Sequence, residues 1–260
     1  MLIDLSGHTT LITGASQGLG RAMAARLSAS GADVILVARD MARLQETCAD
    51  LAGTARGALL PIACDITDVP ARDAAMAEAL DRFPTIDILI NNAGSSRRGP
   101  IEDQPRAAMI DDLDLKLLAP LALVQAVLPG MKAQRWGRIL NVTAIVGKTP
   151  DGGSLPTSVS RGAGITMSKA LSRELAPWNI LVNALCVGKI KSGQWERRHA
   201  AAGDDTSYEA FLEPVAKTVP LGRLGEAEEF ANVACFLASD LAGYVTGTAI
   251  NVDGGLCAVP

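Results

Sequence analysis

Aromatic residues and histidines are scarce in this 260-residue sequence: Phe, Trp and Tyr make up 3% of the chain, and there are only two histidines. A surface that binds nucleic acid normally carries clustered Lys and Arg, often beside aromatic rings. Here the formal net charge is −4 and no basic tract is present. We therefore expect no nucleic-acid partner. His8 and His199 are too few and too isolated for a metal site.

Secretion, membrane and disulfide signals are also missing. The N-terminus, MLIDLSGHTT, has no basic run before a long apolar segment, so it does not resemble a secretion signal. The longest apolar stretch follows Lys116 and is broken at Gln125, which is too short for a membrane span. No cysteine stands in a CxxC or other metal-ligand spacing, so all five are expected to be small reduced core residues: Cys48, Cys64, Cys186, Cys235 and Cys257. These absences favour a cytoplasmic protein without a membrane partner.

Apolar runs that alternate with longer helical patterns predict an α/β fold. Hydrophobic residues make up 48% of the chain and charged residues 20%, enough to bury a large core. The predicted strands are 9–13, 33–38, 58–63, 86–91, 137–143, 179–186 and 248–252. The predicted helices are 18–30, 40–52, 69–82, 106–133, 157–176 and 226–238. Continuously apolar strands separated by helices indicate a parallel sheet covered on both faces.

The sequence predicts one domain over residues 1–260, because no Pro/Gly/Ser-rich linker and no internal repeat divides the chain. Residues 193–219 are more polar and less regular than the rest and contain the run HAAAGDD. This segment is either a substrate lid or an ordinary surface insertion.

The first predicted strand runs directly into a glycine-rich turn, TGASQGLG (13–20), and then into a helix. Glycines let the chain turn sharply and let the helix N-terminus approach a pyrophosphate. Free backbone N–H groups and the helix dipole then hold the anion. Such a turn can also serve tight packing alone, but its place between a strand and a helix favours a dinucleotide.

Several motifs together resemble the short-chain dehydrogenase/reductase family. The turn is similar to the family's TGxxxGxG fingerprint, and NNAG (91–94) is similar to its motif after the fourth strand. Asp65 and Ile66 resemble the pair that brackets the adenine, and residues 223–240 and 244–255 resemble the closing helix and strand. The resemblance covers essentially the whole chain. It implies a Rossmann fold with a doubly wound, seven-stranded parallel sheet and helices on both faces.

The residue at the end of the second strand indicates whether the cofactor is NAD(H) or NADP(H). An acidic residue there would bind the adenosine ribose and repel a 2′-phosphate. This sequence has Ala38 and Arg39 instead, so a guanidinium is available to pair with the phosphate. NADP(H) is therefore the expected cofactor, although Arg39 could also be a solvated residue at a helix entrance. The residues that the resemblance assigns to the cofactor are Gly14, Ser16, Gln17, Gly18, Leu19, Gly20, Arg39, Asp65, Ile66, Asn91, Ala93, Gly94, Arg161, Gly188, Ile190 and Ser192.

The family's four catalytic positions are all changed. In the family a tyrosine transfers the proton, and a lysine four residues later holds the nicotinamide ribose. A serine polarises the substrate oxygen, and an asparagine on an earlier helix orients a water. The resemblance puts Thr157 at the tyrosine, Arg161 at the lysine, Ala144 at the serine and Lys116 at the asparagine. The Asn-Ser-Tyr-Lys set is thus replaced.

The replacements limit the chemistry that this site can perform. Threonine is a far weaker acid than tyrosine, and arginine stays protonated, so Arg161 can hold a hydroxyl or an anion only. Lys116 is either a structural or anion-binding lysine, or a desolvated one whose pKa a neighbouring Arg161 lowers toward proton transfer. Thr143, Ser158, Ser160 and Tyr208 are further hydroxyls near the expected site. Tyr244, the other tyrosine, is expected to pack.

Two functional interpretations follow. The first is an NADP(H)-dependent oxidoreductase acting on a small molecule, with Lys116, Thr157 and Arg161 as its catalytic residues. The second is an NADP(H)-binding protein without dehydrogenase turnover, acting as a sensor or structural subunit. The resemblance also implies a homotetramer, or a dimer at low concentration, through the helices that contain Lys116 and residues 157–176.

Overall fold

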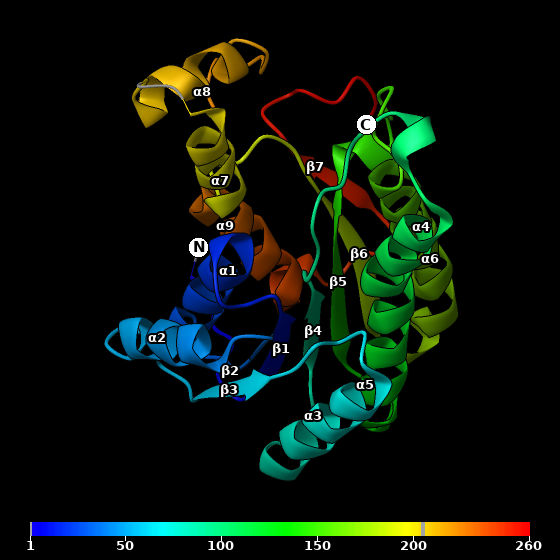
Figure 1. Ribbon diagram of the computed structural model, residues 1–260. Coiled ribbons are helices and arrows are strands. Elements are labelled where there is room, and N and C mark those ends of the chain that lie inside the picture. The colour runs from blue at the N-terminus through cyan, green and yellow to red at the C-terminus, as the bar shows by residue number, and fades with distance from the viewer. Residues whose placement is uncertain (1, 204–205) are drawn as a thin grey trace.

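The protein folds around a seven-stranded parallel sheet, seen in a computed structural model that describes residues 2–203 and 206–260 (Figure 1). The strands are β1 (Thr9–Thr13), β2 (Asp33–Ala38), β3 (Leu59–Ala63), β4 (Ile88–Asn91), β5 (Gly137–Ala144), β6 (Ile180–Val187) and β7 (Ala249–Val252). They lie in the order β3-β2-β1-β4-β5-β6-β7, and every neighbouring pair is parallel. The predicted Rossmann fold class is confirmed, with strand ends displaced by no more than two residues.

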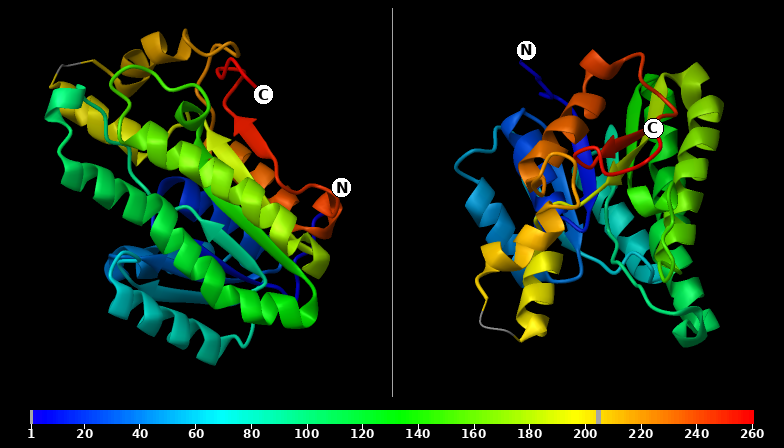
Figure 2. Two further views of the ribbon diagram at one scale, coloured as in Figure 1. Left: turned by 90° about the vertical axis from the view of Figure 1, so that its right-hand side faces the viewer. Right: turned by 90° about the horizontal axis from the view of Figure 1, so that it is seen from above.

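Helices cover both faces of the sheet (Figures 1 and 2). One face carries α1 (Gly18–Ala29), α2 (Met41–Leu51) and α9 (Ala227–Ala238), and the other carries α3 (Val69–Arg82), α4 (Arg106–Leu113), α5 (Ala119–Gln134) and α6 (Thr157–Leu175). Met23, Leu27 and Phe230 are buried in the core on the first face, and Leu123 and Leu175 in the core on the second. Every residue of the central strands β1 and β4 is buried, which fits their aliphatic and β-branched sequences, TTLIT and ILIN.

The predicted helix over 106–133 is interrupted by one π-helical turn. Between α4 and α5 the turn η2 (Asp114–Leu118) holds Lys116 on its buried side. The helical stretch Arg106–Gln134 is 29 residues long and, by length and composition alone, could cross a membrane. The apolar stretch between Lys116 and Gln125 was expected to be too short for a membrane span. The helix is longer than this stretch because it continues at both ends of it. In the fold, however, Val124 and Val127 on this helix pack into the core beneath the sheet.

The segment 193–219 is more regular than predicted. It forms α7 (Gly193–Ala202) and α8 (Tyr208–Ala216), which pack on each other above the carboxyl ends of the strands (Figure 1). The His199 ring lies 5.6 Å from the Tyr208 ring and 5.2 Å from the Phe211 ring. Residues 204 and 205, at the end of the HAAAGDD run, lie outside the described residues.

The remaining helical turns are short, and two packing expectations need correction. The 3-10 turns are η1 (Ile101–Asp103), η3 (Ile145–Gly147), η4 (Ala176–Trp178) and η5 (Asp240–Ala242). Tyr244 was expected to pack, but its side chain is fully exposed in the isolated chain. All five cysteines are free, as predicted, yet Cys48 and Cys257 are only partly buried.

Candidate functional site

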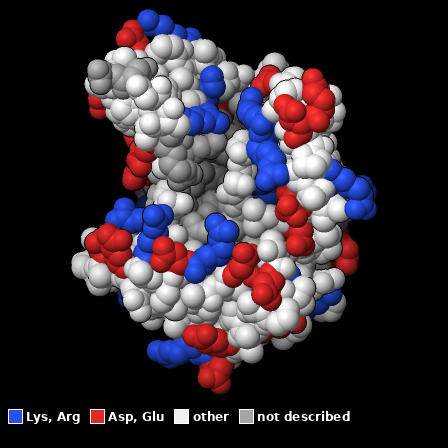
Figure 3. Space-filling model, in the orientation of Figure 1, with Lys and Arg blue, Asp and Glu red and all other residues white. Residues whose placement is uncertain are grey.

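A large cleft opens at the carboxyl ends of the strands, where β1 pairs with β2 on one side and β4 on the other. The order in which strands are added to the sheet reverses at this point, and open α/β sheets bind ligands at such positions. Figure 3 shows the cleft as a deep hollow between α7 and α8 on one side and the body of the molecule on the other. Its lining comes from the glycine-rich turn, the ends of β2 and β5, the loop after β4, the start of α6 and the segment after β6.

The glycine-rich turn has the conformation that an anion site needs. Gly14 and Gly18 adopt φ values of +66° and +54°, a region that side chains rarely enter. A Cβ on Gly20 would lie 2.1 Å from the carbonyl oxygen of Gly14, so only glycine lets α1 start this close to the turn. The N-cap residue Gln17 makes no side-chain hydrogen bond to α1. The first N–H groups of the helix therefore remain available to a phosphate.

Hydrogen bonds hold the glycine-rich turn against the end of β4. The Thr13 hydroxyl accepts hydrogen bonds from the backbone N–H groups of Asn92 and Ala93 at 2.9 and 3.0 Å. The Asn92 side-chain amide donates to the carbonyl oxygens of Thr13 and Gly14. Asn91, predicted to touch the cofactor, is buried and donates to Asn141 Oδ1 at 2.9 Å. Asn91 and Gly20 therefore support the cleft from behind, whereas most other predicted cofactor residues line it.

One end of the cleft carries the residues expected around an adenosine. Ser16, Arg39, Asp65 and Ile66 all line it, and so does Arg43, which the sequence did not single out. The Asp65 carboxylate accepts hydrogen bonds from the hydroxyl and the N–H group of Thr67 at 2.7 and 3.0 Å. The Thr67 hydroxyl is the main cause that lowers the pKa of Asp65, and the charge of Arg39 adds to it.

The segment after β6 forms the upper wall. A Cβ on Gly188 would lie 2.4 Å from the Cβ of Asp253, so the close approach of the closing strand requires glycine there. Ile190 forms a bridge with Gly225, and Ser192 is the N-cap residue of α7. Gly188, Ile190 and Ser192 all line the cleft, as the sequence predicted for cofactor residues.

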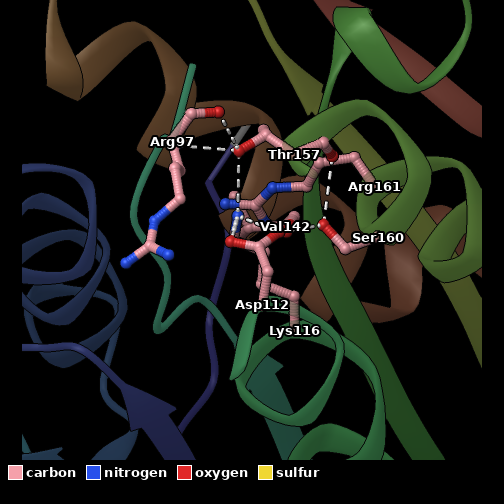
Figure 4. Close-up of polar contacts among 7 residues, drawn as sticks. All are labelled: Arg97, Asp112, Lys116, Val142, Thr157, Ser160 and Arg161. Atoms are coloured by element: carbon pink, nitrogen blue, oxygen red, sulfur yellow. Dashed lines mark hydrogen bonds and ion pairs between the residues drawn. The ribbon is translucent and has the colours of Figure 1, made fainter. Parts of the chain in front are cut away.

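Beneath the cleft floor lies a buried polar cluster, which joins η2 to the start of α6 (Figure 4). Lys116 Nζ lies 2.6 and 2.7 Å from the two carboxylate oxygens of Asp112 and 3.3 Å from Thr157 Oγ1. The Ser160 hydroxyl lies 2.6 Å from Asp112 Oδ2. The Lys116 side chain is completely buried, and that of Asp112 is 6% exposed.

Thr157 connects this cluster to the cleft. Its hydroxyl accepts a hydrogen bond from the Arg97 N–H at 2.9 Å and donates one to the Arg97 carbonyl oxygen at 3.1 Å. The Arg97 side chain points away from the cluster (Figure 4). Thr157 lines the cleft, whereas Lys116 reaches it only through the Thr157 hydroxyl.

Burial changes the acidity of both cationic side chains in the cluster. Desolvation is the main cause that lowers the pKa of Lys116 to about 8; the charge of Arg161 adds to the shift, and the Asp112 carboxylate opposes it. A lysine with this pKa exchanges its proton near neutral pH. Burial also lowers the pKa of Arg161, to about 10, so its guanidinium stays charged at neutral pH.

Arg161 is fixed at the cleft floor. Its Nη1 donates to the Val142 carbonyl oxygen at 2.6 Å, while its buried Nε has no hydrogen-bond partner among the described residues. A Cβ on Gly94 would lie 2.7 Å from Arg161 Nη2, so glycine leaves room for the guanidinium. Arg161 lines the cleft, where its guanidinium could hold a hydroxyl or an anion.

The structure brings Lys116, Thr157, Ser160 and Arg161 together, as predicted, and adds Asp112. The sequence signal for Asp112 was its position four residues before Lys116, a spacing that favours ion pairs on one helix face. Two other candidates lie elsewhere. Thr143 is turned toward Cys186, with its hydroxyl 3.2 Å from Sγ. The Tyr208 hydroxyl is buried and has no partner among the described residues.

Comparisons with known proteins agree with the fold and the cleft. A family model described as Enoyl-(Acyl carrier protein) reductase matches residues 14–257. The chain is 33% identical over 258 residues to a 3-oxoacyl-(acyl-carrier-protein) reductase from Aquifex aeolicus, covering 98% of this chain and 100% of the relative.

Solved structures give the same result. The L-sorbose reductase of Gluconobacter frateurii, solved with NADPH and L-sorbose, is similar over the full length of both chains, with a TM-score of 0.96 and 30% identity. An actinorhodin polyketide ketoreductase solved with NADPH has a TM-score of 0.89 and 30% identity, covering 97% of this chain and 98% of that one. The fold and site define a dinucleotide-binding α/β oxidoreductase. The chain belongs to the short-chain dehydrogenase/reductase family.

Proposed function

We propose that this protein is an NADP(H)-dependent reductase of small carbonyl compounds with an atypical catalytic set, Lys116, Thr157 and Arg161. The observation that carries the proposal is that one cleft joins the glycine-rich turn to Thr157 and Arg161. A cofactor held at the turn and a substrate held at Thr157 would therefore share a single hollow. The NADPH-bound reductases to which the chain is similar support this assignment.

The residues present fit NADP(H). The turn accepts a pyrophosphate at the start of α1, because Gly20 leaves no Cβ in the way. Arg39 and Arg43 supply positive charge at the adenosine end, where no carboxylate occupies the end of β2. Arg161 would hold a ribose hydroxyl at the other end. When bound, NADPH would supply the hydride for the substrate carbonyl carbon.

The proton would come through Thr157. Its hydroxyl releases the hydrogen bond to the Arg97 carbonyl oxygen and gives its proton to the substrate oxygen as the negative charge develops there. In the same step Lys116 Nζ, 3.3 Å away, returns a proton to Thr157 Oγ1. Lys116 ends neutral beside Asp112. After the product leaves, the Thr157 hydroxyl returns a proton to Lys116 and takes one from water in the cleft. Coupling the two transfers avoids a free threonine alkoxide, which is far too basic to form alone.

The function is tested by NADPH consumption against a panel of ketones, imines and enones. We expect oxidation of NADPH with activated carbonyl compounds, and slow turnover of simple ketones because a tyrosine donor is missing. Tight NADPH binding with no consumption across the panel would instead favour a protein that binds NADP(H) without dehydrogenase turnover.

Arg39 is expected to set the choice between the two nicotinamide cofactors. Wild type should bind NADPH more tightly than NADH by about 1.5–3 kcal/mol, the usual range for hydrogen bonds to a charged group. Arg39→Ala should lose most of this preference, since the 2′-phosphate then loses its nearest cation. Fluorescence titration of both proteins with both cofactors measures it, with Arg82→Ala as a control at the far end of α3. Equal affinities of wild type for NADPH and NADH would show that Arg39 does not bind the 2′-phosphate.

We also propose that the protein is cytoplasmic and forms a homotetramer, or a dimer at low concentration. Exposed apolar side chains support the assembly. Ile110, Leu118 and Val159 are exposed on the helical layer of α4, η2, α5 and α6, and Phe236 and Tyr244 are exposed near β7. Such residues commonly become buried between subunits.

A further inference from the structure

The cleft mouth carries two arginines that the proposed reaction does not use. Arg98 lies in the loop after β4, and Arg198 lies on α7. Both line the same cleft as Thr157 and Arg161. Figure 3 shows Lys and Arg side chains on both sides of the hollow, one group beneath α7 and α8 and one on the opposite wall.

The positive charge of this pair is poorly neutralised. Arg98 Nη1 lies 3.7 Å from Asp151 Oδ2, and these side chains are 47% and 70% exposed, so the ion pair is weak. The Arg198 guanidinium stacks on the Trp195 ring at 4.7 Å. Within the described part of the chain, no carboxylate forms an ion pair with Arg198.

The two guanidinium groups line one cleft from opposite segments, Arg98 from the loop after β4 and Arg198 from α7. Burial lowers the pKa of Arg198, and the positive charge of Arg98 lowers it further. Two like charges that face a common cleft destabilise each other unless an anion lies between them. Trp195, which stacks against Arg198, and Leu256 line the same cleft and offer apolar contact to a hydrocarbon chain.

We infer that Arg98 and Arg198 form an anion subsite, and that the substrate carries a carboxylate or phosphate group remote from its carbonyl. The anion binds between the two guanidinium groups, and the hydrocarbon part packs on Trp195 and Leu256. The carbonyl group then faces Thr157. This inference rests on the proposed reductase function, and it narrows the substrate to oxo acids or phosphorylated carbonyl compounds.

The first test compares levulinate with its uncharged methyl ester in NADPH-dependent reduction. Wild type should prefer levulinate in kcat/KM by roughly 10- to 100-fold, as expected for charge-assisted hydrogen bonds. Arg98→Gln/Arg198→Gln should lose the preference through KM, while the control Arg82→Gln should keep it. The preference should also fall at high salt, because both arginines are partly exposed.

A second test measures binding without turnover. Succinate should bind the wild-type NADPH complex in a calorimetric titration and should not bind that of the double variant. If neither these ketones nor any compound of the ketone, imine and enone panel is reduced but succinate behaves in this way, the anion subsite stands while the reductase proposal fails. Equal reduction of levulinate and its ester, with no succinate binding, overturns the subsite and leaves the reductase intact. A double variant that loses NADPH affinity also overturns it, because the arginines would then hold a cofactor phosphate.

Discussion

Lys116→Met is expected to lower the rate of carbonyl reduction by about 10²–10⁴-fold, the usual loss when a positioned acid is removed. NADPH affinity should remain nearly unchanged, because the Lys116 side chain lies beneath the cleft floor and reaches the cleft only through Thr157. Steady-state kinetics and NADPH fluorescence titration measure the two effects separately. Because Lys116→Met leaves the Asp112 carboxylate buried without its counter-ion, Asp112→Asn/Lys116→Met should show the same loss of rate.

The matched control is Lys169→Met, which removes an exposed lysine from α6. That variant should keep both its rate and its NADPH affinity. Full turnover in Lys116→Met would show that the proton does not come from Lys116.

Asp112→Asn is expected to destabilise the folded protein by about 3–5 kcal/mol, the cost of breaking a buried ion pair on one side. The Lys116 ammonium would then be buried without its counter-ion, at the centre of a cluster that joins η2 to α6. Urea denaturation at neutral pH measures the change in the free energy of unfolding.

Two further variants distinguish the cost of breaking the buried ion pair from the cost of removing a charge at the surface. Asp112→Asn/Lys116→Met removes both charges and should recover most of the stability. Glu213→Gln breaks an exposed pair with the same spacing, Glu213 and Lys217, and should change stability far less. If Asp112→Asn is no more destabilising than Glu213→Gln, the buried cluster is not the stabilising contact described here.

The strands of the sheet could be predicted from the sequence because their pattern is local. A strand buried on both faces is rich in aliphatic and β-branched residues, and β1, β2 and β4 through β6 all show such runs. The glycine-rich turn could also be predicted from the sequence, since Gly14, Gly18 and Gly20 occupy positions where a Cβ is strained or has no room.

Asp112 was missed because its role depends on the π-helical turn. Asp111, Asp112 and Asp114 stand almost adjacent in the sequence, and a change in helical phase decides which of them faces inward. Only Asp112 is buried beside Lys116, whereas Asp111 lines the cleft. The helices α7 and α8 were missed because α7 is mostly polar, with His199 as its ring contact to Tyr208 and Phe211 on α8.

The pH dependence of NADPH-driven reduction tests the central claim most directly. Burial and the charge of Arg161 lower the pKa of Lys116 to about 8, and only the protonated amine can supply the proton. Reduction should therefore proceed at a constant rate below pH 8 and fall tenfold per pH unit well above it, whereas residual activity in Lys116→Met should show no such fall. A wild-type rate that stays level through pH 10, or an identical profile in Lys116→Met, would contradict proton donation from Lys116 through Thr157.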